Sequence, residues 1–138
     1  MIKKIIVMAI KPEYAKAIYE GKKHWEFRKA PPPVLEPMFI YESAPVGKIT
    51  GMVTFVVKIT SSAELVWKLA TMQMWDQRGT GITKRELQEY AGGDKGQVSA
   101  LKVLSCTRFD VPFELRNRPP QNWGRYEFDF GDKEVQHG

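Results

Sequence analysis

The sequence predicts an α+β domain with about six β-strands and short peripheral helices. Two observations lead to this fold class. Apolar or alternating runs typical of strands recur along the chain, and between them lie segments with helical spacing and capping residues. A chain of 138 residues is long enough for one domain with a substantial core. We therefore expect a single domain over residues 1–130 and a flexible tail over residues 131–138.

The first strand and the first helix are predicted at the N-terminus. Residues 3–10 are almost continuously apolar, which is typical of a strand buried on both faces. Residues 11–20 are predicted to form a helix, with Pro12 at its first position because no N–H partner is needed there. Gly21 then fits the residue after the helix, where φ is usually positive.

A short strand with two different faces is predicted from Trp25 onwards. A period of two places Trp25 and Phe27 on one face, and Glu26 and Arg28 on the other. The prolines at 31–33 end this strand, because proline donates no hydrogen bond to a sheet ladder.

The rest of the chain repeats these patterns. Further strands are predicted over residues 38–43, 48–60, 97–107, 112–115 and 126–130, and further helices over residues 63–70 and 83–91. In the strand at 48–60, Gly51 marks a bulge or a close-packing point. The helix at 63–70 has Leu65 on its apolar face. The helix at 83–91 begins with a capping box, because Glu86 follows Thr83 by three residues.

Composition indicates a globular protein with an anionic partner. The chain is 43% hydrophobic and 27% charged, which is ordinary for a globular domain. Its formal net charge of +5 favours an anion such as RNA or a nucleotide. No apolar run approaches the roughly 18 residues that cross a bilayer, so no membrane contact is expected. The single cysteine, Cys106, excludes an internal disulfide and fits a reducing cytoplasm. We expect the protein to be a monomer.

Several kinds of catalytic centre do not fit the sequence. Its two histidines, His24 and His137, are too few for a zinc site, so no metal or other cofactor is expected. A Ser-His-Asp triad would need His24, which no nucleophile motif accompanies. The loop at 78–81 lacks the spacing of a phosphate-binding loop.

Charged residues gather around the short strand. Lys23 is predicted to lie in a turn at 22–24, because within the strand it would share the apolar face. From that turn it can swing towards Glu26 and Arg28. The same charges also fit a solvated hairpin edge that has no binding role.

These residues resemble a known motif. Gly21, Lys23, Glu26 and Arg28 match the G-x-K-x-x-E-x-R pattern of the ASCH domain, the activating signal cointegrator homology domain. Other segments resemble the same family in the same order: residues 10–15, 39–46, 49–51, 100–103, 112–115 and 119–123. The resemblance runs from about residue 5 to residue 128. It implies a PUA-like small β-barrel with peripheral helices and a ligand cleft lined by the motif.

Two functions fit these residues. In the first, the domain binds RNA or a nucleotide-like molecule. Lys23 and Arg28 hold a phosphate or a base edge, and Glu26 orients them and accepts from an exocyclic amine. Trp25 or Trp123 stacks on the base. The resemblance supports this interpretation, because the ASCH fold is similar to RNA-binding PUA-like barrels.

In the second function the protein is an amidohydrolase. Some small ASCH proteins deacetylate acetylcytidine with a lysine, a threonine and a glutamate, and the resemblance assigns Lys23, Glu26 and Glu86 to these positions. A lysine of lowered pKa would activate the nucleophile. Glu26 replaces the threonine, however, and a carboxylate favours the charged form of Lys23. A ribonuclease, known in the wider family, would have to use the same groups, so the sequence leaves catalysis open.

Overall fold

The strands form one six-stranded mixed sheet in the order β2-β5-β4-β3-β1-β6. The structure is a computed structural model that describes residues 1–72 and 77–131. Its strands are β1 (Ile2–Ile10), β2 (Trp25–Arg28), β3 (Met38–Glu42), β4 (Lys48–Ser62), β5 (Gln97–Phe113) and β6 (Trp123–Asp129). Its helical elements are α1 (Pro12–Tyr19), α2 (Ala63–Met72), the 3₁₀ helix η1 (Gln77–Thr80) and α3 (Lys84–Ala91). The α+β class is confirmed; the expected tail lies outside the described residues from position 132 onwards.

The N-terminal strand and helix lie where the sequence predicted them. Ile6, Val7 and Met8 of β1 are fully buried, so the second half of this strand contacts the core on both faces. Helix α1 begins at Pro12 and packs against β3 and β5. Gly21 follows the helix with φ +74°, a left-handed conformation that side chains with a Cβ rarely adopt.

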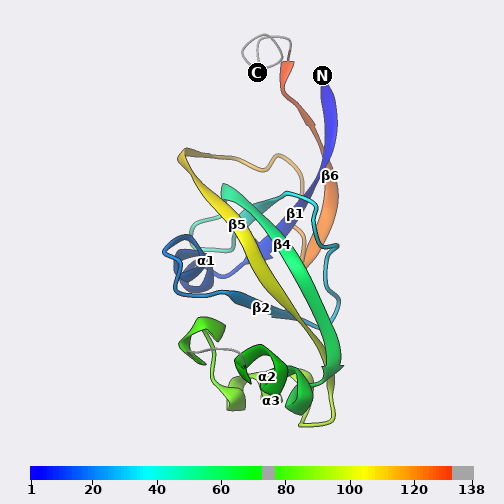
Figure 1. Ribbon diagram of the computed structural model, residues 1–138. Helices are drawn as coiled ribbons and strands as arrows, with labels where there is room; N and C mark the ends of the chain where they lie inside the picture. Colours follow the sequence, from blue (N-terminus) through cyan, green and yellow to red (C-terminus); the bar gives the residue numbers. More distant parts are fainter. Residues whose placement is uncertain (73–76, 132–138) are drawn as a thin grey trace.

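Strands β4 and β5 run side by side across the molecule, and α2 and α3 lie at the end where β4 leads towards β5 (Figure 1). The register of the pair shifts between Ile49 and Gly51, which confirms the expected bulge. A Cβ on Gly51 would lie 2.2 Å from the carbonyl oxygen of Thr107, so the two strands approach too closely there for any other residue.

One long strand replaces the two that were predicted over residues 97–107 and 112–115. Strand β5 continues to Phe113 although Pro112 has no N–H to donate. Arg108 pairs with Gly51 and Phe113 pairs with Ile49. Residues 109–112 of β5 therefore form a bulge opposite the single residue Thr50 of β4. Proline is tolerated in such a bulge because no ladder hydrogen bond is required of it.

The sheet is open, which corrects the expected closed barrel. Among residues 1–72 and 77–131, strand β2 pairs only with β5 and β6 pairs only with β1, so no ladder there joins the two edges. Strand β2 has only four residues, and the prolines at 31–33 cannot extend it. The side chain of Arg28 spans the gap instead. It donates to the carbonyl of Ala9 in β1 and to the side chain of Asn122 before β6, at 2.8 Å each.

The core beneath α2 and α3 contains the apolar face of β2. Trp25 and Phe27 pack there with Val66 and Trp67, which confirms the predicted division of faces along residues 25–28. Leu65 is exposed, contrary to expectation, because α2 turns Val66 and Trp67 towards the sheet.

Candidate functional site

A cleft of ≈ 610 Å³ opens beside the polar face of β2 and is called here the Glu26 cleft. A space of this size is typical of small-molecule sites. The residues that line it come from the end of β1, from α1, β2, α3 and the loop before β6: Ala9, Lys11, Tyr14, Glu26, Phe27, Arg28, Lys29, Ala30, Ile82, Glu86, Glu89, Tyr90, Gln121 and Asn122.

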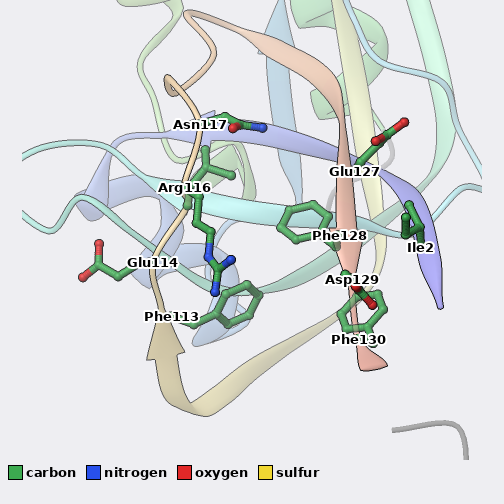
Figure 2. Close-up of a pocket in the computed structure, with 10 residues that line it drawn as sticks. Ile2, Phe113, Glu114, Arg116, Asn117, Glu127, Phe128, Asp129 and Phe130 are labelled. Atoms are coloured by element: carbon green, nitrogen blue, oxygen red, sulfur yellow. The ribbon is translucent and has the colours of Figure 1, made fainter. Parts of the chain in front are cut away.

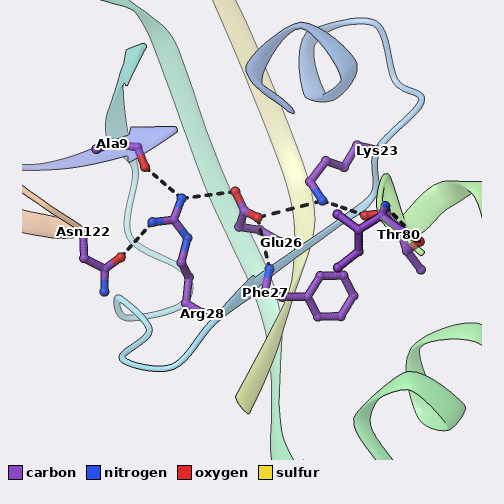
Figure 3. Close-up of polar contacts among 8 residues, drawn as sticks. Ala9, Lys23, Glu26, Phe27, Arg28, Thr80 and Asn122 are labelled. Carbon is purple, nitrogen blue, oxygen red and sulfur yellow. Dashed lines mark hydrogen bonds and ion pairs between the residues drawn. The ribbon is translucent and has the colours of Figure 1, made fainter. Parts of the chain in front are cut away.

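Glu26 lies at the centre of a polar network beside this cleft (Figure 3). Its side chain is 7% exposed, and it sits between two cations: Oε2 is 3.3 Å from Arg28 Nη2, and Oε1 is 3.8 Å from Lys23 Nζ. Oε1 also accepts the backbone N–H of Phe27 at 3.1 Å. A carboxylate this deeply buried requires such partners, because an unpaired charge away from water is costly.

Lys23 is buried, which corrects the expectation of a lysine free to swing. Its side chain is 1% exposed, and Nζ donates to the carbonyl oxygen of Thr80 at 2.6 Å. Gly81 covers its stem, since a Cβ there would lie 2.7 Å from Lys23 Cδ. Burial lowers the pKa of Lys23 from its usual value, Glu26 opposes this, and Arg28 lowers it further. Lys23 therefore supports Glu26 from behind and does not line the cleft.

Arg28 lines the cleft, but protein acceptors already hold its guanidinium. Nη1 donates to Asn122 Oδ1 at 2.8 Å, and Nη2 donates to the carbonyl of Ala9 at 2.8 Å and to Glu26 Oε2 at 3.3 Å. These bonds give Arg28 a structural role at the open edge of the sheet, beyond the ligand contact that the sequence predicted.

Glu86 both caps α3 and lines the cleft. Its carboxylate accepts the N–H of Thr83 at 2.9 Å, and the Thr83 hydroxyl accepts the N–H of Glu86 at 3.1 Å, so the predicted capping box is confirmed. The hydrogen bonds with Thr83 lower the pKa of Glu86, and the nearby Lys23 and Lys11 act in the same direction. The capping role and a place on the cleft are therefore compatible.

The aromatic rings on the cleft are not those of the two tryptophans predicted to stack on a base. Trp25 is 7% exposed and packs in the core, because it lies on the opposite face of β2 from Glu26. Trp123 begins β6 and donates from Nε1 to the carbonyl of Ala30 at 3.0 Å, without lining the cleft. Tyr14 and Tyr90 line it instead.

Sequence reasoning missed both tyrosines. Tyr90 follows Glu86 by four residues in one helix, a spacing that puts both on one face and that could have identified it. Tyr14 lies in the first turn of α1. Burial raises its pKa, and carboxylates including Glu86 and Glu26 add to the shift, which places its hydroxyl in their field.

Comparison with known proteins agrees with the family resemblance seen in the sequence. The sequence model of the ASCH domain matches residues 8–106. The chain belongs to the ASCH domain family. The crystal structure of ASCH from Zymomonas mobilis has a TM-score of 0.72 at 22% identity, covering 95% of this chain and 90% of that one.

Two mutants of the same Zymomonas mobilis protein give similar values. Both have a TM-score of 0.73; one is 21% identical and covers 98% of this ASCH domain and 96% of its own chain. The other is 23% identical and covers 96% and 92%. At this identity the likeness shows a shared fold. None of the curated proteins matches the chain.

A second cleft of ≈ 610 Å³ lies elsewhere in this ASCH domain, between β6 and the segment after β5 (Figure 2). Phe113 lies on one side of it and Phe128 and Phe130 on the other, and charged or polar side chains also line it: Glu114, Arg116, Asn117, Glu127 and Asp129. No residue of the sequence motif lines it. The Glu26 cleft is therefore the one that carries the polar chemistry of the motif.

Residues 1–72 and 77–131 of this ASCH domain contain no group of three or more His, Cys, Asp or Glu side chains arranged to hold a metal ion. The same residues also contain no helix with the length and apolar character needed to cross a bilayer.

Proposed function

We propose that this ASCH domain binds RNA or a nucleotide-like molecule by taking one base into the Glu26 cleft. The observation that carries the proposal is the combination of a paired, buried carboxylate with two tyrosine rings on one cleft. Rings offer stacking surfaces, and a carboxylate accepts hydrogen bonds from base amines. Neither property is needed for solubility, which was the other explanation of the charged motif.

The surroundings of the rings favour stacking. Tyr90 is 42% exposed, and Lys29 Nζ lies 5.1 Å from its ring centroid. Tyr14 has Lys23 Nζ at 5.1 Å from its own centroid. Each ring thus has a cation close to it, and base stacking on such a ring is worth about 1–3 kcal/mol.

Exposed cations beside the cleft suit the phosphate of a nucleotide or of an RNA strand. Lys11 and Lys29 both line the cleft and are exposed. Contacts of this kind strengthen binding without selecting sequence, and they weaken as salt is added.

Calorimetric titration with short single-stranded RNA and with free nucleosides tests the proposal. Tyr90→Ala should weaken binding by about 1–3 kcal/mol, whereas Tyr90→Phe keeps the ring and should bind nearly as well. Leu104→Ala, an exposed position on β5, is the surface control. If neither RNA nor any nucleoside binds the wild-type protein, or if Tyr90→Ala binds as tightly, the proposal is wrong.

The amidohydrolase remains a second candidate because burial lowers the pKa of Lys23, as a lysine base requires. Against it, the Lys23 side chain is 1% exposed and Glu26 stands between it and the cleft. Incubation with acetylcytidine followed by chromatography separates the two functions. Cytidine release that disappears in Lys23→Ala and in Glu86→Gln, with both variants folded, would support hydrolysis. No release from wild type would exclude this substrate.

A further inference from the structure

Resting on the proposed function, we infer that the Glu26 cleft selects guanine. The Glu26 carboxylate receives two neighbouring donors of this base, the ring N1–H and the exocyclic N2 amine. The inference follows from the number of acceptor sites that Glu26 still offers and from the pattern of donors on the four bases.

Glu26 keeps unused acceptor capacity on both oxygens. A carboxylate offers about four lone-pair sites. Oε1 accepts from the N–H of Phe27 at 3.1 Å, and Oε2 accepts from Arg28 Nη2 at 3.3 Å. Lys23 Nζ is 3.8 Å from Oε1, longer than a hydrogen bond, and donates to Thr80 instead. Within the part of the chain that the structure describes, one site therefore remains on each oxygen, and Glu26 is among the residues that line the cleft.

Two adjacent acceptors match guanine alone among the common bases. Guanine presents N1–H and the N2 amine side by side, so each donor meets one carboxylate oxygen. Adenine and cytosine present an amine beside a ring nitrogen lone pair, and uracil presents one N–H between two carbonyls. Each of these three edges would set an acceptor against an oxygen of a carboxylate that is only 7% exposed, which is unfavourable.

The other charged residues of the cleft do not compete for this role. Glu86 caps α3 and Glu89 pairs with Arg85. Arg28 gives three of its five N–H donors to protein acceptors, which holds it beside Glu26. The base that binds is neutral, so the ion pair between Glu26 and Arg28 stays intact and the donors of guanine are added to it.

Calorimetry on the wild-type protein with five nucleosides tests the inference. Guanosine should bind most tightly, and inosine, which keeps N1–H but lacks the N2 amine, should bind on the order of tenfold more weakly. Adenosine, cytidine and uridine should bind more weakly than inosine. Equal affinities for guanosine and inosine, or tighter binding of any other base, would overturn the inference while leaving base binding in place.

Variants then show which residue causes the preference for guanosine over inosine. Glu26→Gln replaces one acceptor oxygen with a donor amide. In this variant guanosine and inosine should bind with equal affinity. Glu114→Gln is the matched control, because Glu114 is an exposed carboxylate outside this cleft that pairs with Lys48 at 3.9 Å; the affinity ratio of this variant should equal that of wild type. If Glu26→Gln does not fold, the wild-type ratio decides. If no nucleoside and no RNA binds, the proposed function itself fails, which is a different outcome from binding without preference.

Discussion

Replacing Arg28 with alanine should destabilise the fold, because this side chain is the bridge between two sheet edges that no ladder joins. It connects β2 to Ala9 of β1 and to Asn122 before β6 with hydrogen bonds of 2.8 Å each. It also pairs with the buried carboxylate of Glu26 at 3.3 Å, and its own side chain is only 14% exposed. Truncation therefore removes three contacts in one place and leaves a buried charge with one partner fewer.

The size of the effect follows from these contacts. Hydrogen bonds to a charged group contribute about 1.5–3 kcal/mol each, and removing one partner of a buried ion pair costs about 3–5 kcal/mol. These values overlap, because one guanidinium makes all three bonds, and such coupled terms do not add. We expect Arg28→Ala to lower the free energy of unfolding by about 3–5 kcal/mol, a large share of the roughly 5–15 kcal/mol of a typical domain.

Urea unfolding measures this quantity directly. Arg125→Ala is the matched control: Arg125 likewise pairs with a carboxylate, that of Glu36, through two bonds of 2.7 and 3.3 Å, but on the surface. Its free energy of unfolding should stay close to that of wild type, since exposed ion pairs contribute little. A loss below about 1 kcal/mol for Arg28→Ala would refute the bridge and return Arg28 to a purely ligand-binding role.

Three further predictions follow from buried positions. Trp25→Ala should lower the free energy of unfolding by about 3–5 kcal/mol, because the ring is 7% exposed in the core under α2; an unchanged melt would mean that the faces of β2 are reversed. Gly51→Ala should lower the free energy of unfolding by about 3 kcal/mol in urea unfolding, the upper end of the usual cost of overpacking, since its Cβ would lie 2.2 Å from the Thr107 carbonyl oxygen and 2.5 Å from the Tyr19 hydroxyl; a wild-type midpoint would disprove this packing. Burial raises the pKa of Tyr19 from 10.0 to about 12, so its contribution to stability is complete below pH 10.0 and is lost as the pH rises towards 12. Tyr19→Phe should remove that part of the alkaline loss of stability, and equal alkaline losses in both proteins would contradict the burial effect.

Local patterns in the sequence predicted local structure well. The alternation at residues 25–28, the left-handed Gly21 and the capping box at Thr83 all depend on neighbours a few residues apart, and each is present. The extent of β5 was missed because a proline normally ends a strand, and only the bulge opposite Ile49 and Gly51 makes Pro112 acceptable.

The parts of the site that the sequence did not reveal depend on distant contacts. Lys23 was expected in a mobile turn, yet its acceptor is the carbonyl of Thr80, 57 residues further along the chain. Nothing near Lys23 in the sequence indicates that η1 and Gly81 cover it. The expectation of a closed barrel was wrong for a similar reason. Strand β2 has only four residues, and Arg28 contacts Ala9 of β1 across the gap where a ladder would have closed the sheet.

The four motif residues therefore have different roles within this ASCH domain. Gly21 ends a helix, Lys23 neutralises a buried carboxylate from behind, and Arg28 joins two edges of the sheet. Glu26 is the motif residue that keeps unused acceptor sites beside the cleft. The stacking surfaces come from Tyr14 and Tyr90, outside the motif. It follows from the proposed function that the motif alone does not specify the ligand: another domain with the same four residues but different side chains on α1 and α3 would present the same acceptor to a differently shaped base.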